Sequence, residues 1–198
     1  MGFNTVEKFE HEIAQFFGSP YAVAVDSCTH AIELCLRYKN VTHTACPKHS
    51  YLSIPMTFEK VGIQYRLIDA KWKEYYHLAH TNIIDAAVTW RENSYVPNTF
   101  MCISFQFKKH LSLGRGGMIL CDNQHDKNEL IKMSYDGRTR GTSWQEQTIN
   151  TIGYHYYMTP ETASLGLSKL DDAKNKMPKS WSWKDYPNLS TMPIFHDK

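Results

Sequence analysis

The stretch SFQFKKHLSLGRGG, residues 104–117, decides how the rest of the sequence is interpreted. It continues a short apolar segment, contains the adjacent lysines Lys108 and Lys109, and ends in a glycine cluster. Two lysines in a loop are ordinarily a solvated surface pair. A lysine that is partly buried beside other cations instead has a lowered pKa and becomes a nucleophile. The choice between these interpretations depends on what surrounds the stretch in the fold.

Short apolar runs alternate along the chain with segments of helical periodicity. YAVAV at 21–25 predicts a buried strand, and DSCTHAIELCLRY after it predicts a polar turn that opens a helix. Strand, turn and helix make half of a βαβ unit, so we expect an α/β fold with a mostly parallel or mixed sheet flanked by helices. The other predicted strands cover 63–69, 82–85, 99–105 and 117–121, and the other predicted helices cover 6–17 (between Thr5 as N-cap and Gly18 as stop), 53–62, 126–134 and 159–176.

The composition is that of an ordinary globular chain. Of 198 residues, 42% are hydrophobic and 21% are charged, and the formal net charge is +2. This balance gives no reason to expect nucleic acid or a membrane as a partner, and no apolar run reaches the roughly 18 residues of a membrane helix. Five scattered cysteines without CxxC spacing, and a start without a signal-peptide core, predict a cytoplasmic protein with reduced thiols and no metal site.

A polar cluster follows the first predicted strand, at the sheet edge where α/β proteins usually bind ligands. Ser27, Cys28, Thr29 and His30 open the predicted helix. They either cap that helix or offer its free N–H groups and its dipole to a phosphate group. Taken alone, capping is the commoner role.

Asp85 and Tyr51 have two interpretations each. Asp85 ends a strand, where it either caps the next turn or keeps a cationic ring nitrogen protonated. Tyr51 either belongs to the core or stacks on a flat ligand. The glycines of 114–117 would also suit a simple phosphate-binding loop, but such a loop explains neither Asp85 nor the position of Lys109.

Five motifs occur in a definite order. They are YAVAVDSCTHAIEL (21–34), CPKHSYLS (46–53), IIDAAV (83–88), SFQFKKHLSLGRGG (104–117) and GYHYYMTPETASLGLSKL (153–170). Their order and spacing resemble the DegT/DnrJ/EryC1/StrS family, the sugar aminotransferases of fold type I that depend on pyridoxal 5'-phosphate (PLP). The family's lysine motif, SFhxxKxLxxGxGG, is present with every spacing intact. The resemblance runs from about Val6 to Leu170, and it implies a transferase-like domain over 1–176 followed by a C-terminal tail over 177–198.

The resemblance implies a role for each matching position. Lys109, and not Lys108, would be the catalytic lysine that joins the cofactor aldehyde, and Asp85 would hold the pyridine nitrogen. The remaining cofactor-binding residues would be Cys28, Thr29 and His30 at the phosphate, Ser104 with its hydroxyl, Tyr51 stacked on the ring, and His155 reaching the phosphate of a partner subunit in a homodimer with shared active sites.

The sequence also departs from the family pattern. Val88 replaces a glutamine, His155 and Tyr157 replace the asparagine and arginine of an NyR motif, and Cys28 replaces a glycine. Only 15 residues separate Asp69 from Asp85, and only 28 follow Leu170. We therefore expect a compacted relative without the family's C-terminal small domain.

The resemblance implies an aminotransferase that moves an amino group from glutamate or glutamine to a keto-sugar, with a nucleotide-linked sugar expected. Two alternatives remain open at this point. One is a PLP-binding or scaffold protein that has lost catalysis, which the departures favour. The other is different PLP chemistry, such as dehydration or racemisation of a sugar or amino acid, although Lys109 argues against the dehydratase branch, where histidine replaces the lysine.

Overall fold

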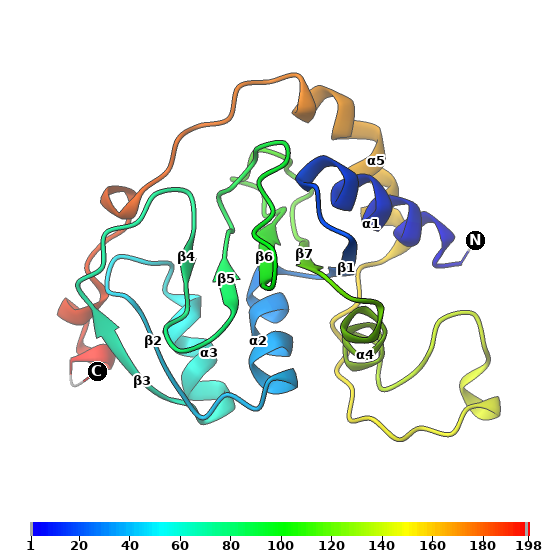
Figure 1. Ribbon diagram of the computed structural model, residues 1–198, viewed down its shortest axis with the longest axis horizontal. Coiled ribbons are helices and arrows are strands. Elements are labelled where there is room, and N and C mark those ends of the chain that lie inside the picture. The colour runs from blue at the N-terminus through cyan, green and yellow to red at the C-terminus, as the bar shows by residue number, and fades with distance from the viewer. Residues whose placement is uncertain (1, 197) are drawn as a thin grey trace.

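A computed structural model describes residues 2–196 and 198 of the chain. Its centre is a five-stranded sheet in the order β1-β7-β6-β5-β4, with helices on both faces (Figure 1). The strands are β1 (Tyr21–Val25), β4 (Tyr76–His77), β5 (Ile83–Asp85), β6 (Phe100–Ser104) and β7 (Gly117–Cys121). β5 and β6 are parallel, whereas the β1–β7, β6–β7 and β4–β5 pairs are antiparallel. The sheet is therefore mixed, one of the two arrangements predicted.

Both faces of this sheet are covered by helices, which explains why its strands are apolar throughout. Val23 and Val25 of β1 face the cluster that contains α2 (Cys28–Tyr38) and α4 (Gln124–Ser134). Ala22 and Ala24 face the opposite cluster, which contains α1 (Asn4–Phe17) and α5 (Pro160–Lys174). The alternation of side chains along a strand thus builds two cores, one on each side of the sheet.

The predicted helices form, with one error at a helix start. Gly18 ends α1 with φ of 75°, as expected for a left-handed C-cap residue, and the Thr159 hydroxyl caps α5. Thr5 was expected to be the N-cap of α1, but the helix begins at Asn4, after Phe3, and Thr5 lies within its first turn. The core contacts of this helix, among them Val6 and Phe9, determine where it packs without a side-chain cap.

A smaller parallel sheet lies beside the main one. It pairs β2 (His43–Pro47) with β3 (Gln64–Ile68), and α3 (Ser53–Val61) connects the two strands. The sequence predicted β3 and α3 but neither β2 nor β4. β2 mixes polar residues with a proline and β4 has two residues, so neither carries a periodic apolar signal.

The segment after α5 crosses the molecule (Figure 1) and bonds to the loop after β2 and to the connection between β3 and β4. The backbone N–H of Glu74 donates to the Trp181 carbonyl at 2.9 Å, and that of Leu189 donates to the Lys48 carbonyl at 2.8 Å. Leu189 and Phe195 are buried. This segment is therefore an ordered part of the fold and contributes to its core. No helix among residues 2–196 and 198 is long and apolar enough to cross a membrane.

Gly117 is the point of closest approach between the sheet and the start of α2. A Cβ atom at this position would lie 2.4 Å from the Ser27 carbonyl carbon, and that atom belongs to backbone that cannot move aside alone. We expect Gly117→Ala to lower the free energy of unfolding by about 3 kcal/mol, measured by urea denaturation.

The matched control for this prediction is Gly114→Ala, in the same loop. Gly114 has φ of 80° and no neighbour within 4 Å of a Cβ, so only backbone strain of about 1 kcal/mol applies. An equal loss of stability in both variants would show that steric contact with Ser27 is not the limiting constraint.

Candidate active site

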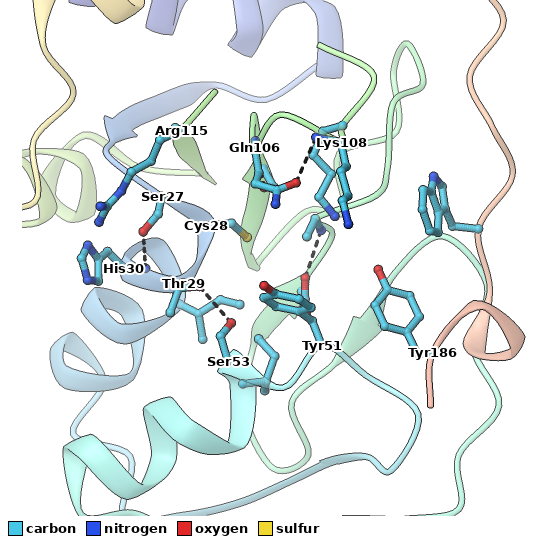
Figure 2. A pocket seen from close by; sticks show the side chains of 18 residues that line it. Ser27, Cys28, Thr29, His30, Tyr51, Ser53, Gln106, Lys108, Arg115 and Tyr186 are labelled. Atoms are coloured by element: carbon cyan, nitrogen blue, oxygen red, sulfur yellow. Dashed lines mark hydrogen bonds between the residues drawn. The ribbon is translucent and has the colours of Figure 1, made fainter. Parts of the chain in front are cut away.

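A cavity of about 550 Å³ lies at the carboxyl ends of β5 and β6 and at the N-terminus of α2 (Figure 2). Its walls come from segments that are far apart in the sequence. All but one of the residues predicted for the site line it, namely Cys28, Thr29, His30, Tyr51, Asp85, Ser104 and Lys109.

Lys109 is held in this cavity by a tight loop between β6 and β7. The Phe107 N–H donates to the Gly114 carbonyl at 3.0 Å, and the Lys109 N–H donates to the Gln106 carbonyl at 2.8 Å. The turn leaves Lys108 exposed and Lys109 partly buried. Burial lowers the pKa of Lys109, while Asp85 and Cys28 act in the opposite direction. The two adjacent lysines are thus inequivalent, because burial acts on Lys109 while Lys108 is exposed.

Asp85 is a buried carboxylate, 5% exposed, with a donor for each oxygen. Oδ1 accepts the Ala87 N–H at 3.0 Å, and Oδ2 accepts the Tyr76 hydroxyl at 2.5 Å. Burial raises the pKa of Asp85, and the bonds from Tyr76 and Ala87, together with the charge of Lys109, partly offset that rise. Tyr76 was not identified from the sequence, because only its place on the two-residue strand β4 brings it to Asp85.

The N-terminus of α2 forms one end of the cavity. The Ser27 hydroxyl accepts the His30 N–H at 3.2 Å, which confirms that Ser27 caps the helix. The Thr29 hydroxyl bonds Ser53 at 2.9 Å, and the His30 ring contacts Asp26 through Nδ1 at 2.6 Å. Capping and ligand binding are compatible here, because the cap orders the helix end whose dipole faces the cavity.

Cys28 lines the cavity but does not offer a reactive thiol. Its Sγ donates to the Cys102 carbonyl at 3.5 Å, and burial raises the pKa of the thiol well above its ordinary value. Any contribution of Cys28 to ligand binding therefore comes from its backbone N–H and its shape.

Cationic side chains predominate around the cavity. Arg115 lines it and pairs with Asp26 at 2.9 Å, and Figure 2 shows Arg115 and His30 at the end where α2 begins. Lys108 lies farther along the opening. Asp85 is the one carboxylate among the described lining residues, so the opening attracts anionic ligands.

Three aromatic side chains form the other end. Tyr51 is 53% exposed, so the possibility that it belongs to the core is excluded. Tyr186 lies near it in Figure 2, and Trp181 completes the wall. Trp181 and Tyr186 belong to the C-terminal segment and were not predicted, because that segment has no periodicity to reveal which side chains turn inward.

His155 lies outside the cavity. Its side chain is 70% exposed, and Nδ1 contacts Asp136 at 3.1 Å. It does not contribute to the site of its own chain, and its role in a partner's site stays a prediction.

The mixed sheet with helices on both faces defines the fold as that of the fold type I PLP-dependent transferases. Within that class, the chain belongs to the DegT/DnrJ/EryC1/StrS aminotransferase family, whose model matches residues 1–97 and 96–181.

Individual relatives are similar over most of this chain but are longer. The chain is 27% identical to a dTDP-3-amino-3,4,6-trideoxy-alpha-D-glucose transaminase of Micromonospora megalomicea subsp. nigra, over 82% of this chain and 42% of the relative. It is 23% identical to the spore coat polysaccharide biosynthesis protein SpsC of Bacillus subtilis, over 78% of this chain and 51% of that protein. The chain therefore spans about half the length of the curated relatives it matches.

Solved structures show the same fold. Spr1654 from Streptococcus pneumoniae, in its PLP-form, matches with a TM-score of 0.72 at 19% identity, over 85% of this chain and 59% of that one. AtS13 from Actinomadura melliaura matches with a TM-score of 0.74 at 17% identity, over 87% and 61%. The overall fold is thus that of the family, as the sequence resemblance implied.

We expect Tyr76→Phe to destabilise the protein in a pH-dependent way. The hydroxyl stabilises mainly the ionised form of Asp85, so its loss raises the pKa of this carboxyl further above the ordinary 3.8. Below that pH the carboxyl is protonated in both folded and unfolded chains, and variant and parent differ least. As the pH rises, the unfolded chain ionises more readily, and the variant becomes less stable than the parent by about 2 kcal/mol at neutral pH.

Urea unfolding between acidic and neutral pH measures this difference. Tyr75→Phe is the control, because the neighbouring Tyr75 hydroxyl makes no hydrogen bond within the described part of the chain. A destabilisation of Tyr76→Phe that stays constant across the pH range would mean that Asp85 is not ionised in the folded protein.

Proposed function

We propose that this chain is a PLP-dependent aminotransferase that transfers an amino group from glutamate or glutamine to a nucleotide-linked keto-sugar. The observation that carries the proposal is the meeting of Lys109, Asp85 and the α2 N-terminus around one cavity. A lysine with a lowered pKa, a buried carboxylate and a helix N-terminus are the three groups that a pyridine aldehyde bearing a phosphate requires.

The residues present fit PLP in size and charge. The cavity of about 550 Å³ lies within the range of small-molecule sites, roughly 300–1,000 Å³. The N-terminus of α2, with Thr29 and His30, would hold the phosphate, and Ser104 would add a hydroxyl. Tyr51, which is exposed at the cavity, would stack on the ring. The absence of a side chain at Gly117 lets the sheet approach the helix end closely.

Two side chains would carry the chemistry. When bound, PLP supplies an electron sink for the carbon that loses a proton. Asp85, ionised with the help of Tyr76 and Ala87, would keep the ring nitrogen protonated through a charge-assisted bond. Lys109 Nζ would take the proton from the substrate carbon and return it at the neighbouring position, because its lowered pKa favours the neutral amine.

The proposal extends to the organisation of the chain. Residues 1–176 would form the transferase-like domain and 177–198 a C-terminal tail that closes one side of the site. The protein would act as a cytoplasmic homodimer, in which the exposed His155 reaches the phosphate site of the partner. The division of the chain and the homodimer rest on the family resemblance. The role of His155 rests also on the exposure of its side chain.

A second candidate is a PLP-binding protein without transferase activity. Val88 stands beside Asp85 at the edge of the site, where the family pattern has a glutamine, and it cannot hydrogen-bond a ring hydroxyl. This candidate predicts that the cofactor attaches to Lys109 but that no amino donor converts it.

The test uses purified protein incubated with PLP. We expect a visible absorbance band that borohydride reduction converts to a stable modification of Lys109, located by peptide mass spectrometry. Lys109→Ala removes this attachment, whereas Lys108→Ala retains it, because the Lys108 side chain is exposed while that of Lys109 is partly buried in the cavity with Asp85. Attachment at any other lysine would contradict the assignment.

Adding glutamate then separates the two candidates. An aminotransferase converts the visible band to pyridoxamine phosphate and releases 2-oxoglutarate, both measurable by chromatography. A protein that binds PLP at Lys109 but shows no conversion with glutamate or glutamine would favour the second candidate.

A further inference from the structure

A second and smaller cavity, of about 140 Å³, adjoins the first. The two share Ala87, Ser104, Lys108, Lys109 and Trp181 as lining residues. The smaller one also has Lys179 in its wall. A group bound there would lie beside the Lys109 amine and within reach of a molecule in the main cavity.

The smaller cavity carries an excess of positive charge. Apart from Lys109, two of the described residues that line it are lysines, Lys108 and Lys179, and none is an aspartate or glutamate. Lys108 makes no ion pair within residues 2–196 and 198, and its Nζ contacts the Phe107 ring at 5.5 Å. Lys179 pairs with Asp185 at 3.1 Å, but Asp185 does not line the cavity. An anion in this cavity would therefore meet Lys108, which has no ion-pair partner among the described residues, and would share Lys179 with Asp185.

Trp181 positions these charges. The Lys179 Nζ lies 3.7 Å from the centroid of the Trp181 ring, and the Lys109 Nζ lies 5.8 Å from it. The backbone of Trp181 is fixed by the bond from the Glu74 N–H, so the ring is a firm support. Cation–π contact of this kind holds a long lysine side chain near one place without neutralising its charge.

The size of the cavity limits what it can hold. A volume of about 140 Å³ corresponds to four or five water molecules at roughly 30 Å³ each, which suits a carboxylate or a single phosphate group and excludes a nucleotide. The phosphate of a bound cofactor is already accounted for at the α2 N-terminus, and Figure 2 shows His30 and Arg115 at that end and Lys108 away from it. The smaller cavity is thus a separate place for an anion.

We propose that this smaller cavity, formed by Lys108, Lys179 and Trp181 beside Lys109, binds an anionic group of the substrate that reacts at Lys109. The group is a carboxylate of the amino donor or a phosphate of the sugar substrate. That the bound molecule is a substrate rests on the proposed function, whereas the binding of an anion in this cavity does not. It assigns substrate recognition to the C-terminal segment, which places Lys179 and Trp181 there.

Isothermal titration with unreactive anions tests the proposal without requiring catalysis. The probes are glutarate for the donor carboxylate and inorganic phosphate for the sugar phosphate, with neutral glutaramide as the control compound, at low ionic strength. We expect one anion to bind saturably and glutaramide not to bind. Lys179→Gln and Lys108→Gln should each weaken binding about fivefold, the loss expected for about 1 kcal/mol of charge-assisted bonding.

Lys184→Gln is the matched control variant, because Lys184 belongs to the same segment but lines neither cavity. It should bind the anion as the parent does. Preference for glutarate assigns the cavity to the amino donor, and preference for phosphate assigns it to the sugar substrate. The proposal is overturned if neither anion binds, or if binding survives both glutamine variants unchanged, since the anion then lies elsewhere.

Failure of the anion-site proposal can be distinguished from failure of the proposed function. A protein that never attaches PLP but binds glutarate through Lys179 would retain the anion site and lose the assignment as an aminotransferase. In the opposite case, the protein attaches PLP and converts it with glutamate, but Lys179→Gln leaves the KM for glutamate unchanged and anion binding does not depend on the lysines. The proposed function would then stand and the anion site would be rejected.

Discussion

The site depends on keeping a carboxylate buried next to an amine. Burial opposes the charge of both Asp85 and Lys109, raising the pKa of the first and lowering that of the second. Each charge partly offsets the cost of the other, and the bonds from Tyr76 and Ala87 stabilise the carboxylate further. The ends of β5 and β6 provide this arrangement because parallel neighbours bring their final residues to the same edge of the sheet.

The short connection between β3 and β5 supplies the hydrogen bond from Tyr76 to Asp85. The 15 residues between Asp69 and Asp85 form little more than β4, which pairs antiparallel with β5 and sets Tyr76 opposite Asp85 in register. Compaction of this segment therefore does not leave the carboxylate without a donor. The same register places the phenol in the core, where burial and the adjacent Asp85 raise its pKa and keep it a hydrogen-bond donor.

The C-terminal segment completes the cavity from the other side. Backbone bonds to Glu74 and Lys48, and the burial of Leu189 and Phe195, fix its path across the molecule. Trp181 and Tyr186 are thereby held as walls of the main cavity, and their aromatic faces stand opposite the polar α2 end. A ligand between them meets apolar surface at one end and backbone donors with cations at the other, which favours a molecule with a flat or ring-shaped body and an anionic group.

Periodicity predicted the main elements, such as α2 after β1, because such patterns depend on neighbours in sequence. The order of the five motifs, through the family resemblance, predicted that Asp85, Ser104 and Lys109 belong to one site. The tertiary structure alone decided that Tyr76 bonds Asp85 and that Trp181 and Tyr186 line the cavity. Each of those depends on contacts between segments that local sequence patterns do not encode, through a two-residue strand and a tail without periodicity.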